Sequence, residues 1–333
     1  MKKNIPIFVT HYGCPNQCVF CNQKKISGVN HAVDLAECEL LLNQAVKYNY
    51  PPEETEIAFF GGSFTGIPLE MQKKYLKLAE QFRQYFYGVR LSTRPDYITP
   101  SILDMLLEHG VTTIELGVQS TVDAVLEKNL RKMTHQDTVN AVELIRKYPF
   151  SLGLQMMVSM YGASDDDDIR TADEIIALKP DFVRIYPTVV LENTKLYELY
   201  QAGEYQIKSL EQTVCLTAEI YRKFLNAKIP VIRVGLMASE EINSQNIIGA
   251  YHEAFGELVQ NEIYYQIIKE QLNNKKTIGK KLYIYCGEKE VSKVAGHKRK
   301  NILRLNKEFS FCDVKVCPDP LRKAYQLSLK IEQ

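Results

Sequence analysis

The sequence predicts an α/β protein in which a partial (β/α)6 barrel is followed by a small α+β module. Short apolar runs alternate with longer amphipathic segments, as in the βαβ units that build a parallel sheet. Six such units recur at a spacing of about 30 residues. A lysine-rich break near residue 273 then opens a separate segment with shorter strands and helices.

Each expected barrel strand is a short apolar run bounded by turn or charged residues. The six strands are predicted at residues 5–10, 56–60, 89–93, 112–118, 151–158 and 181–186. Apolar residues at helical spacing predict the helices that follow them, at residues 32–47, 69–85, 100–108, 136–147, 165–178 and 209–226. We expect one more strand at 229–235, then helical residues to about 271.

This order divides the chain into a partial barrel (1–228), a barrel extension (229–272) and a basic module (273–333). Within the module we expect, in chain order, a strand at 282–285, a helix at 291–294, a break at 296–299, a helix at 301–306 and a strand at 312–316.

Composition narrows the class of protein. The chain has 333 residues, 45% of them hydrophobic, so it can bury a sizeable core, and its net charge is +1. We expect no signal peptide and no membrane-spanning segment. Eight cysteines, three of them close together, favour a reducing compartment over a disulfide framework, and we expect a cytoplasmic protein.

Those three cysteines, Cys14, Cys18 and Cys21, have the spacing C-x3-C-x2-C directly after the first expected strand. Three thiolates are one fewer than the four that usually hold an iron–sulfur cube, so one iron would be open to a small molecule. A structural zinc site or three uncoordinated thiols is the alternative. Zinc loops usually supply a second pair of ligands nearby, and here the next cysteine, Cys38, lies in an expected helix.

Other polar motifs also follow expected strands, and parallel barrels place their chemistry at these strand ends. Gly61-Gly62-Ser63 follows the second strand, where paired glycines let a ligand approach the backbone closely. Gln119 follows the fourth, where its amide can bind a ribose or a carboxylate. Arg131 can bind a carboxylate through two N–H groups. Ordinary turn and surface roles are the alternatives.

The cysteine loop resembles that of the radical S-adenosylmethionine (SAM) enzymes, which have a TIM-like partial barrel. A closer resemblance, to the radical SAM half of the elongator catalytic subunit family, extends over Cys14–Cys21, Gly61–Gly66, Ser92–Asp96, Glu115–Ser120 and Val183–Thr188. The segment Gly249–Phe255 and the remainder resemble the C-terminal extension found with such barrels.

The resemblance implies a [4Fe–4S] cluster on Cys14, Cys18 and Cys21, with SAM on the fourth iron. It implies that SAM is bound by Phe20, Gly61, Gly62, Ser63, Gln119 and Arg131. Reductive cleavage of SAM would give a 5′-deoxyadenosyl radical that abstracts a substrate hydrogen, with a reductant such as flavodoxin or ferredoxin. The implied substrate is RNA, in particular tRNA.

Two features depart from that family. Its Arg-x-His-Thr motif reads Arg131-Lys132-Met133-Thr134 here, with methionine in place of histidine. The sequence also ends where the elongator subunit continues into an acetyltransferase domain, so we do not expect acetyl-CoA-dependent carboxymethylation from this chain alone. Oxygen-independent coproporphyrinogen oxidases share much of the barrel's motif order. Radical chemistry on a porphyrin-like small molecule is therefore one alternative function.

The C-terminal module is strongly basic, with eleven Lys or Arg and two acidic residues between Lys275 and Lys307. Its predicted order of elements resembles a minimal KH-type RNA-binding module, which clamps nucleotides with a Gly-x-x-Gly loop. Here the loop reads Gly296-His297-Lys298-Arg299, with arginine in place of the second glycine. Attraction of phosphate by Lys298, Arg299 and Lys300 is still expected. A charged lid on the barrel, or a non-catalytic iron–sulfur RNA-binding protein, are the alternatives.

For the remaining polar features we favour structural roles. The run Asp165–Asp168 is expected to stabilise the start of a helix rather than to bind metal. Cys312 and Cys317 are expected to be structural thiols, and Arg233 and His252 structural side chains, with substrate contact as the alternative for the latter two. Tyr186 suits packing and the lining of the barrel's open face equally well.

Overall fold

The computed structural model describes residues 3–9, 13–14, 17–22, 33–236 and 247–333. They form two compact units, one made of Met1–Thr213 with Lys223–Glu253 and the other of Val214–Arg222 with Ala254–Gln333. The second unit begins earlier than the module expected from the sequence. The reason is that helix α10 (Phe255–Leu272) contributes buried side chains to this unit's core.

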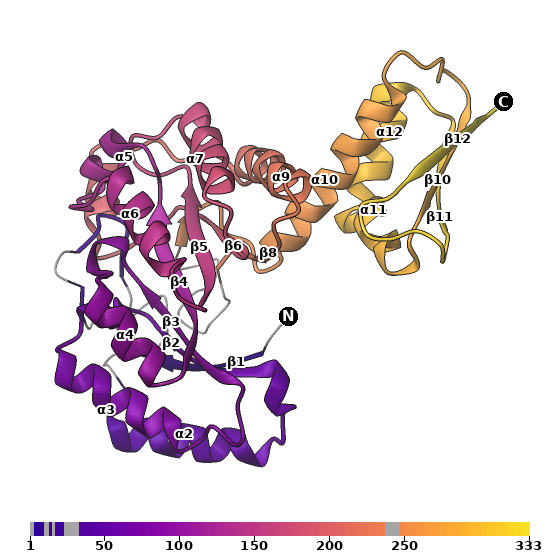
Figure 1. Cartoon of the computed structure of the whole chain (residues 1–333). Coiled ribbons are helices and arrows are strands. Elements are labelled where there is room, and N and C mark those ends of the chain that lie inside the picture. The colour runs from indigo at the N-terminus through magenta and orange to yellow at the C-terminus, as the bar shows by residue number, and fades with distance from the viewer. Residues whose placement is uncertain (1–2, 10–12, 15–16, 23–32, 237–246) are drawn as a thin grey trace. The chain divides into compact units, whose positions relative to one another are not determined.

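The first unit contains a seven-stranded parallel sheet (Figure 1). Its strands are β1 (Lys3–Phe8), β2 (Thr55–Phe60), β3 (Gly88–Thr93), β4 (Val111–Gln119), β5 (Ser151–Val158), β6 (Phe182–Pro187) and β8 (Val231–Val234). Their order in the sheet is β1-β2-β3-β4-β5-β6-β8. This arrangement confirms the α/β half-barrel, and the additional strand expected near residue 229 is its edge strand β8.

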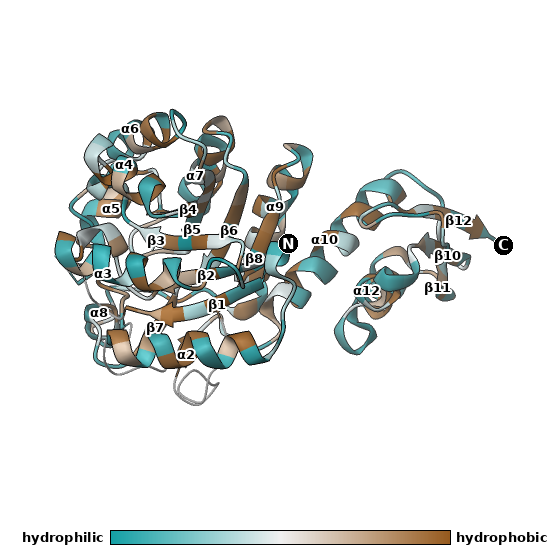
Figure 2. Ribbon diagram, turned by 60° about the horizontal axis from the view of Figure 1, so that its bottom comes forward, coloured by the Kyte–Doolittle hydropathy of each residue, from teal (hydrophilic) through white to brown (hydrophobic). Residues whose placement is uncertain are grey.

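Helices connect the strands of this sheet as the apolar spacing predicts. They are α2 (Leu35–Lys47), α3 (Leu69–Glu80), α4 (Pro100–Glu108), α6 (His135–Ile145), α7 (Asp165–Ala177) and α9 (Leu210–Asn226). Figure 2 shows hydrophobic and hydrophilic residues in alternation along α2, whose buried residues are Cys38, Leu42 and Ala45. No helix in the described part of the chain is long and apolar enough to cross a membrane.

Several short elements were not expected from the sequence. They are the helices α5 (Asp123–Lys128) and α8 (Lys195–Gln201) and the antiparallel pair β7 (Val189–Leu191) and β9 (Ile247–Gly249). Single 3-10 turns occur at Pro52–Glu54, Phe64–Gly66, Pro95–Tyr97, Glu288–Glu290 and His297–Arg299. These segments are too short for their apolar spacing to be distinctive.

Side-chain caps fix where several helices begin. Thr134 caps α6 and Ser164 caps α7, each in a capping box with an aspartate three residues later. The acidic run Asp165–Asp168 therefore occupies the first turn of α7, as predicted. Within it, Asp168 is buried and accepts a hydrogen bond from the Ser159 N–H at 2.7 Å, which ties α7 to the end of β5.

The two faces of the sheet differ in chemistry because successive side chains of a strand point to opposite sides. One face carries buried aliphatic residues such as Leu91, Ile114 and Leu154. The other carries charged and polar residues at the alternate positions, among them Arg90 and Glu115. The apolar face forms the main core with the helices, and the opposite face gives the half-barrel a polar interior.

The second unit has its own core and its own sheet. Its elements after α10 are β10 (Lys281–Cys286), α11 (Val291–Ala295), α12 (Lys300–Phe309), β11 (Asp313–Pro318) and β12 (Ser328–Glu332). The order in the sheet is β11-β10-β12, with β11 parallel and β12 antiparallel to β10. The predicted strand–helix–break–helix–strand order is thus present, and β12 is an additional strand that the sequence did not indicate.

Helix α12 provides a test of this second core. Leu305 is fully buried, whereas Leu303 is 64% exposed on the same helix. We expect Leu305→Ala to lower the free energy of unfolding of this unit by about 2–5 kcal/mol, since it removes buried methyl groups and leaves a cavity. Leu303→Ala is the matched control and should change it by less than about 0.5 kcal/mol. Equal effects of the two variants in chemical denaturation would contradict this packing.

Candidate active site

The cysteine loop follows β1 and presents three thiols with different environments. Cys18 is buried, Cys21 is half-buried and Cys14 is exposed. A turn in which the Cys21 N–H donates to the Cys18 carbonyl at 2.9 Å brings the last two together. Among the described residues, no three His, Cys, Asp or Glu side chains lie close enough to hold a metal ion as they stand.

Contacts with distant segments fix the loop through Val19. Its N–H donates to the Asn129 carbonyl at 3.3 Å, and its carbonyl accepts from the Leu196 N–H at 2.8 Å. The Val19 side chain is buried in a small cluster with Val190, Leu196 and Tyr205, and the half-buried Phe20 packs against this cluster. Phe20 is thus part of the loop's apolar anchor.

The cysteine loop also packs directly against the turn after β2. Gly13 has φ +76°, and a Cβ atom there would lie 2.1 Å from the Ser63 carbonyl oxygen. A Cβ at Gly66 would lie 2.2 Å from the Gly13 carbonyl oxygen. Since neither backbone can give way to a side chain, both positions require glycine. The sequence placed the two motifs at the same end of the sheet but did not indicate this contact.

In the Gly61-Gly62-Ser63 turn, Gly61 has φ +87°, a backbone conformation that favours glycine. Ser63 is fully buried, and its hydroxyl lies 3.0 Å from the Thr93 hydroxyl at the end of β3. The Ser63 side chain therefore ties the turn to the neighbouring strand, which leaves the backbone of the turn as the part suited to a ligand.

Gln119 and Arg131 both lie beside Gly117 at the end of β4, since a Cβ atom on Gly117 would be 3.1 Å from the Gln119 side-chain nitrogen and 3.8 Å from a terminal nitrogen of Arg131. A register shift between Gly117 and Gln119 interrupts the pairing of β4 with β5, and Gln119 has φ +70°. Arg131 donates to the Gly117 carbonyl and, at 3.6 Å, to the Cys18 sulfur. The methionine that replaces the family's histidine, Met133, is buried with its sulfur 3.5 Å from the same guanidinium.

A second buried arginine lies beside the cysteines, and the sequence had not indicated it as a site residue. Arg94, directly after β3, forms a two-pronged contact with Asp96 at 2.8 and 2.7 Å. Desolvation opposes the charge of Arg94, but Asp96, Cys18 and Cys14 together raise its pKa above the ordinary value. Arg94 and Asp96 lie two residues apart directly after an expected strand, and this spacing was the feature of the sequence that could have indicated the pair.

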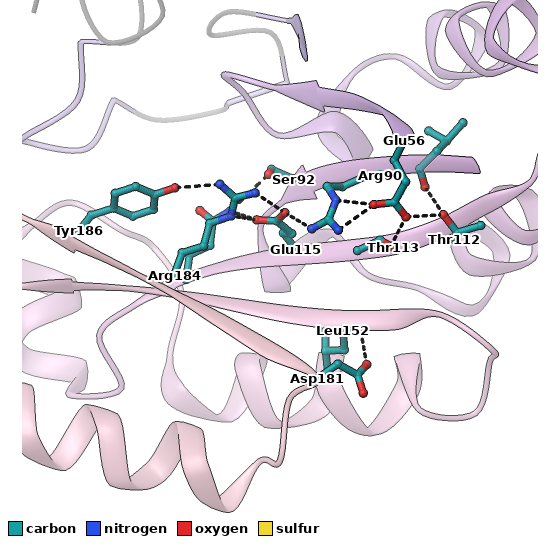
Figure 3. A network of polar contacts seen from close by, with 12 residues as sticks. Glu56, Arg90, Ser92, Thr112, Thr113, Glu115, Leu152, Asp181, Arg184 and Tyr186 are labelled. Carbon is teal, nitrogen blue, oxygen red and sulfur yellow. Dashed lines mark hydrogen bonds and ion pairs between the residues drawn. The ribbon is translucent and has the colours of Figure 1, made fainter. Parts of the chain in front are cut away.

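The polar interior of the half-barrel contains a chain of alternating charges that joins four strands (Figure 3). Arg90 donates to Glu56 at 2.8 Å and to Glu115 at 2.6 Å, and Arg184 donates to Glu115 at 2.9 Å. Gln155 donates to the second Glu115 oxygen at 2.7 Å. Charged residues inside strands are rarely buried unless they are paired. Charged residues inside the expected strands were therefore the feature of the sequence that could have indicated this network.

The residues at the strand ends fit an iron–sulfur cluster with an amino-acid cofactor. Three thiols on one loop supply sulfur ligands, and the guanidiniums of Arg94 and Arg131 balance the negative charge of thiolates. The Gln119 side-chain oxygen and the Arg131 Nε–H are buried and have no hydrogen-bond partner among the described residues. Buried polar atoms of this kind are usually paired, so they indicate a polar ligand beside the cysteine loop.

Comparison with known families agrees with this geometry. The model of the radical SAM superfamily matches residues 8–175, and that of the radical SAM C-terminal domain matches residues 180–265. The chain therefore belongs to the radical SAM superfamily, whose enzymes use a [4Fe–4S] cluster and SAM.

Among curated proteins, the tRNA uridine(34) acetyltransferase of Methanocaldococcus jannaschii is 28% identical over 195 residues, which are 52% of this chain and 36% of that protein. Elongator complex protein 3 of Schizosaccharomyces pombe is 27% identical over 200 residues, 59% of this chain and 37% of that protein. The match thus spans little more than a third of the length of these relatives.

Two solved structures support the fold. The archaeal Elp3 of Methanocaldococcus infernus superposes with a TM-score of 0.62 at 22% identity, over 81% of this chain and 63% of that one. Coproporphyrinogen III oxidase from Escherichia coli gives 0.50 at 15% identity, over 68% and 53%.

The charge network leads to a stability prediction. We expect Glu115→Gln to lower the free energy of unfolding by about 3–5 kcal/mol, because it leaves Arg90 and Arg184 with one fewer buried negative charge. Glu198→Gln, which breaks the exposed pair with Lys195, is the control and should cost at most about 1 kcal/mol. Denaturation midpoints measure both. A Glu115 variant as stable as the control would show that the network does not hold the barrel.

Proposed function

We propose that this protein is a radical SAM enzyme that modifies RNA, with tRNA as the substrate. The observation that carries the enzymatic part is the contact of the cysteine loop with Arg131 and with the Gly61–Gly66 turn at one end of the sheet. The choice of tRNA rests on two observations. The Methanocaldococcus jannaschii relative is a tRNA uridine(34) acetyltransferase, and the second unit has a basic loop.

In this proposal Cys14, Cys18 and Cys21 hold the [4Fe–4S] cluster. When bound by these residues, the cluster would supply one electron for the reductive cleavage of SAM to methionine and a 5′-deoxyadenosyl radical. The backbone of Gly61 and Gly62 receives the methionyl amino group, while Gln119 and Arg131 offer the unpartnered polar atoms that a carboxylate or a ribose needs. The protein's part is to position these groups and to exclude water.

The second unit supplies the surface proposed for RNA. Four exposed residues lie between α11 and the first residue of α12, namely His297, Lys298, Arg299 and Lys300 itself. Gly296, Lys298 and Arg299 have φ values of 79°, 50° and 61°, so Arg299 holds the left-handed conformation that the second glycine of a Gly-x-x-Gly loop adopts easily. The buried Asn301 side chain supports the loop by donating to the carbonyls of Asn261 and Val294 at 2.8 and 3.2 Å.

Anaerobic reconstitution tests the enzymatic part. With SAM and dithionite we expect about four irons per chain and 5′-deoxyadenosine formation that rises when unmodified tRNA is added. Cys18→Ala should lose the cluster and the product. Cys312→Ala, an exposed thiol of the second unit, is the control and should keep both. Product formation that a porphyrin-like compound stimulates and tRNA does not would favour the small-molecule alternative. A cluster without any 5′-deoxyadenosine would favour a non-catalytic iron–sulfur protein.

The basic loop gives a separate prediction. Replacing Lys298, Arg299 and Lys300 by Ala should weaken tRNA binding and reduce the slope of log Kd against log salt by roughly 2, because up to three phosphate contacts are lost. The matched control replaces Lys74, Lys77 and Lys147, three exposed lysines on helices of the first unit or at their ends, by Ala. Filter binding at several salt concentrations measures the slope. Equal slopes for the two triple variants would exclude the loop as the RNA contact.

A further inference from the structure

Three polar side chains on β6 and β8 take no part in the cofactor site. They are Arg184 and Tyr186 on β6 and Arg233 on β8, the edge strand of the sheet. Arg184 and Tyr186 alternate with the buried Val183 and Ile185 and therefore point into the polar interior of the half-barrel (Figure 3).

Strand pairing brings Arg233 to the same interior. A register shift in the pairing of β6 with β8 places Arg233 directly opposite Arg184. Directly paired residues of neighbouring strands point to the same side of a sheet, and irregularities of this kind often re-aim a side chain next to a functional site. Two arginines thus lie side by side on the interior face, with the Tyr186 phenol on the same side.

The charges of these two arginines are balanced very differently. Arg184 donates to Glu115 at 2.9 Å, within the charge network. The half-buried Arg233 has one contact, from its Nε–H to the Gly235 carbonyl at 3.4 Å, and no acidic partner within the described ranges. Among the residues that the structure describes, its two terminal nitrogens have no hydrogen-bond acceptor. For Arg233 the sequence favoured a structural role, with substrate contact as the alternative. A partly buried cation without a counter-charge indicates a place for an anion.

The hydroxyl group of Tyr186 can donate a hydrogen bond. The Arg184 Nη1–H donates to the Tyr186 hydroxyl oxygen at 3.5 Å, which leaves the phenol's own proton for another acceptor. Burial raises the pKa of Tyr186, although the charges of Arg184 and Arg233 oppose the rise. The phenol is therefore protonated at neutral pH and acts as a donor.

We propose that Arg233, Tyr186 and Arg184 form an oxyanion site inside the half-barrel that binds a phosphate group of the substrate nucleotide. The site rests on the proposed function, since it assigns RNA a contact inside the barrel in addition to the basic loop. The donors come from three side chains on two strands, which suits the tetrahedral set of oxygens on a phosphate better than the two coplanar oxygens of a carboxylate.

Calorimetric titration of the cluster-loaded, SAM-saturated protein without reductant tests the site. The ligands are uridine 5′-monophosphate, uridine, inorganic phosphate and succinate. We expect the monophosphate to bind at least about tenfold more tightly than uridine, with Arg233→Gln removing that advantage and Tyr186→Phe reducing it. Arg233→Lys, which keeps the charge but not the planar fork, should fall between the wild type and Arg233→Gln. Arg170→Gln, an exposed arginine on α7, is the control and should leave binding unchanged.

Each outcome has a separate meaning. Equal binding of uridine and its monophosphate, or an unchanged affinity in a folded Arg233→Gln protein, overturns the site even when tRNA still binds. Inorganic phosphate that binds as tightly as the monophosphate shows a free-anion site and also overturns the proposal. Tighter binding of succinate assigns the arginines to a carboxylate-bearing small molecule instead.

A phosphate-dependent affinity that Arg233→Gln removes upholds the site. Failure of tRNA to bind or to stimulate 5′-deoxyadenosine formation would then overturn only the proposed RNA substrate.

Discussion

The chain of charges from Glu56 through Arg90 and Glu115 to Arg184 is the constraint on which the rest of the barrel depends. Two carboxylates and two guanidiniums balance one another, so charged side chains can remain buried between β2, β3, β4 and β6. An interior lined in this way cannot close into an apolar core, and it remains suited to a polar ligand. The same network holds Arg184 beside Tyr186, which connects the stability of the fold with the proposed substrate contact.

The cofactor site depends on a different kind of contact, one between backbones. Gly13 and Gly66 let the cysteine loop lie directly on the turn after β2, and Val19 attaches the same loop to α8 and to the end of α5. Arg131 then joins the end of β4 to Cys18. Backbone packing and the side chain of Arg131 thus bring together the cysteine loop, the glycine turn and the end of β4 that carries Gln119.

The second unit combines a compact core with an exposed basic loop in an uncommon backbone conformation. Buried residues from α10, α12 and the strands form this core, and Lys298 and Arg299 adopt left-handed backbone conformations directly before α12. Non-glycine residues adopt such φ values at some cost, and that cost is typically accepted where a loop has a role. An exposed group of positively charged side chains is the property that the proposed contact with RNA requires.

The sequence by itself determined the order of strands and helices, the polar motifs at the strand ends and the radical SAM family. The periodicity of apolar residues, the turn residues and the spacing of motifs are local properties, so they can be read from the sequence before the fold is known. The sequence could not determine β12, the short helices α5 and α8, or the proximity of Arg94 to Cys14 and Cys18, because these depend on neighbours far away in the chain. Only the tertiary structure decided that Glu115 pairs with Arg90 and Arg184 while Arg233 lacks an acidic partner in the described residues. The physical reason is that a buried charge is defined by its partners, and strand register brings those partners together from separate segments.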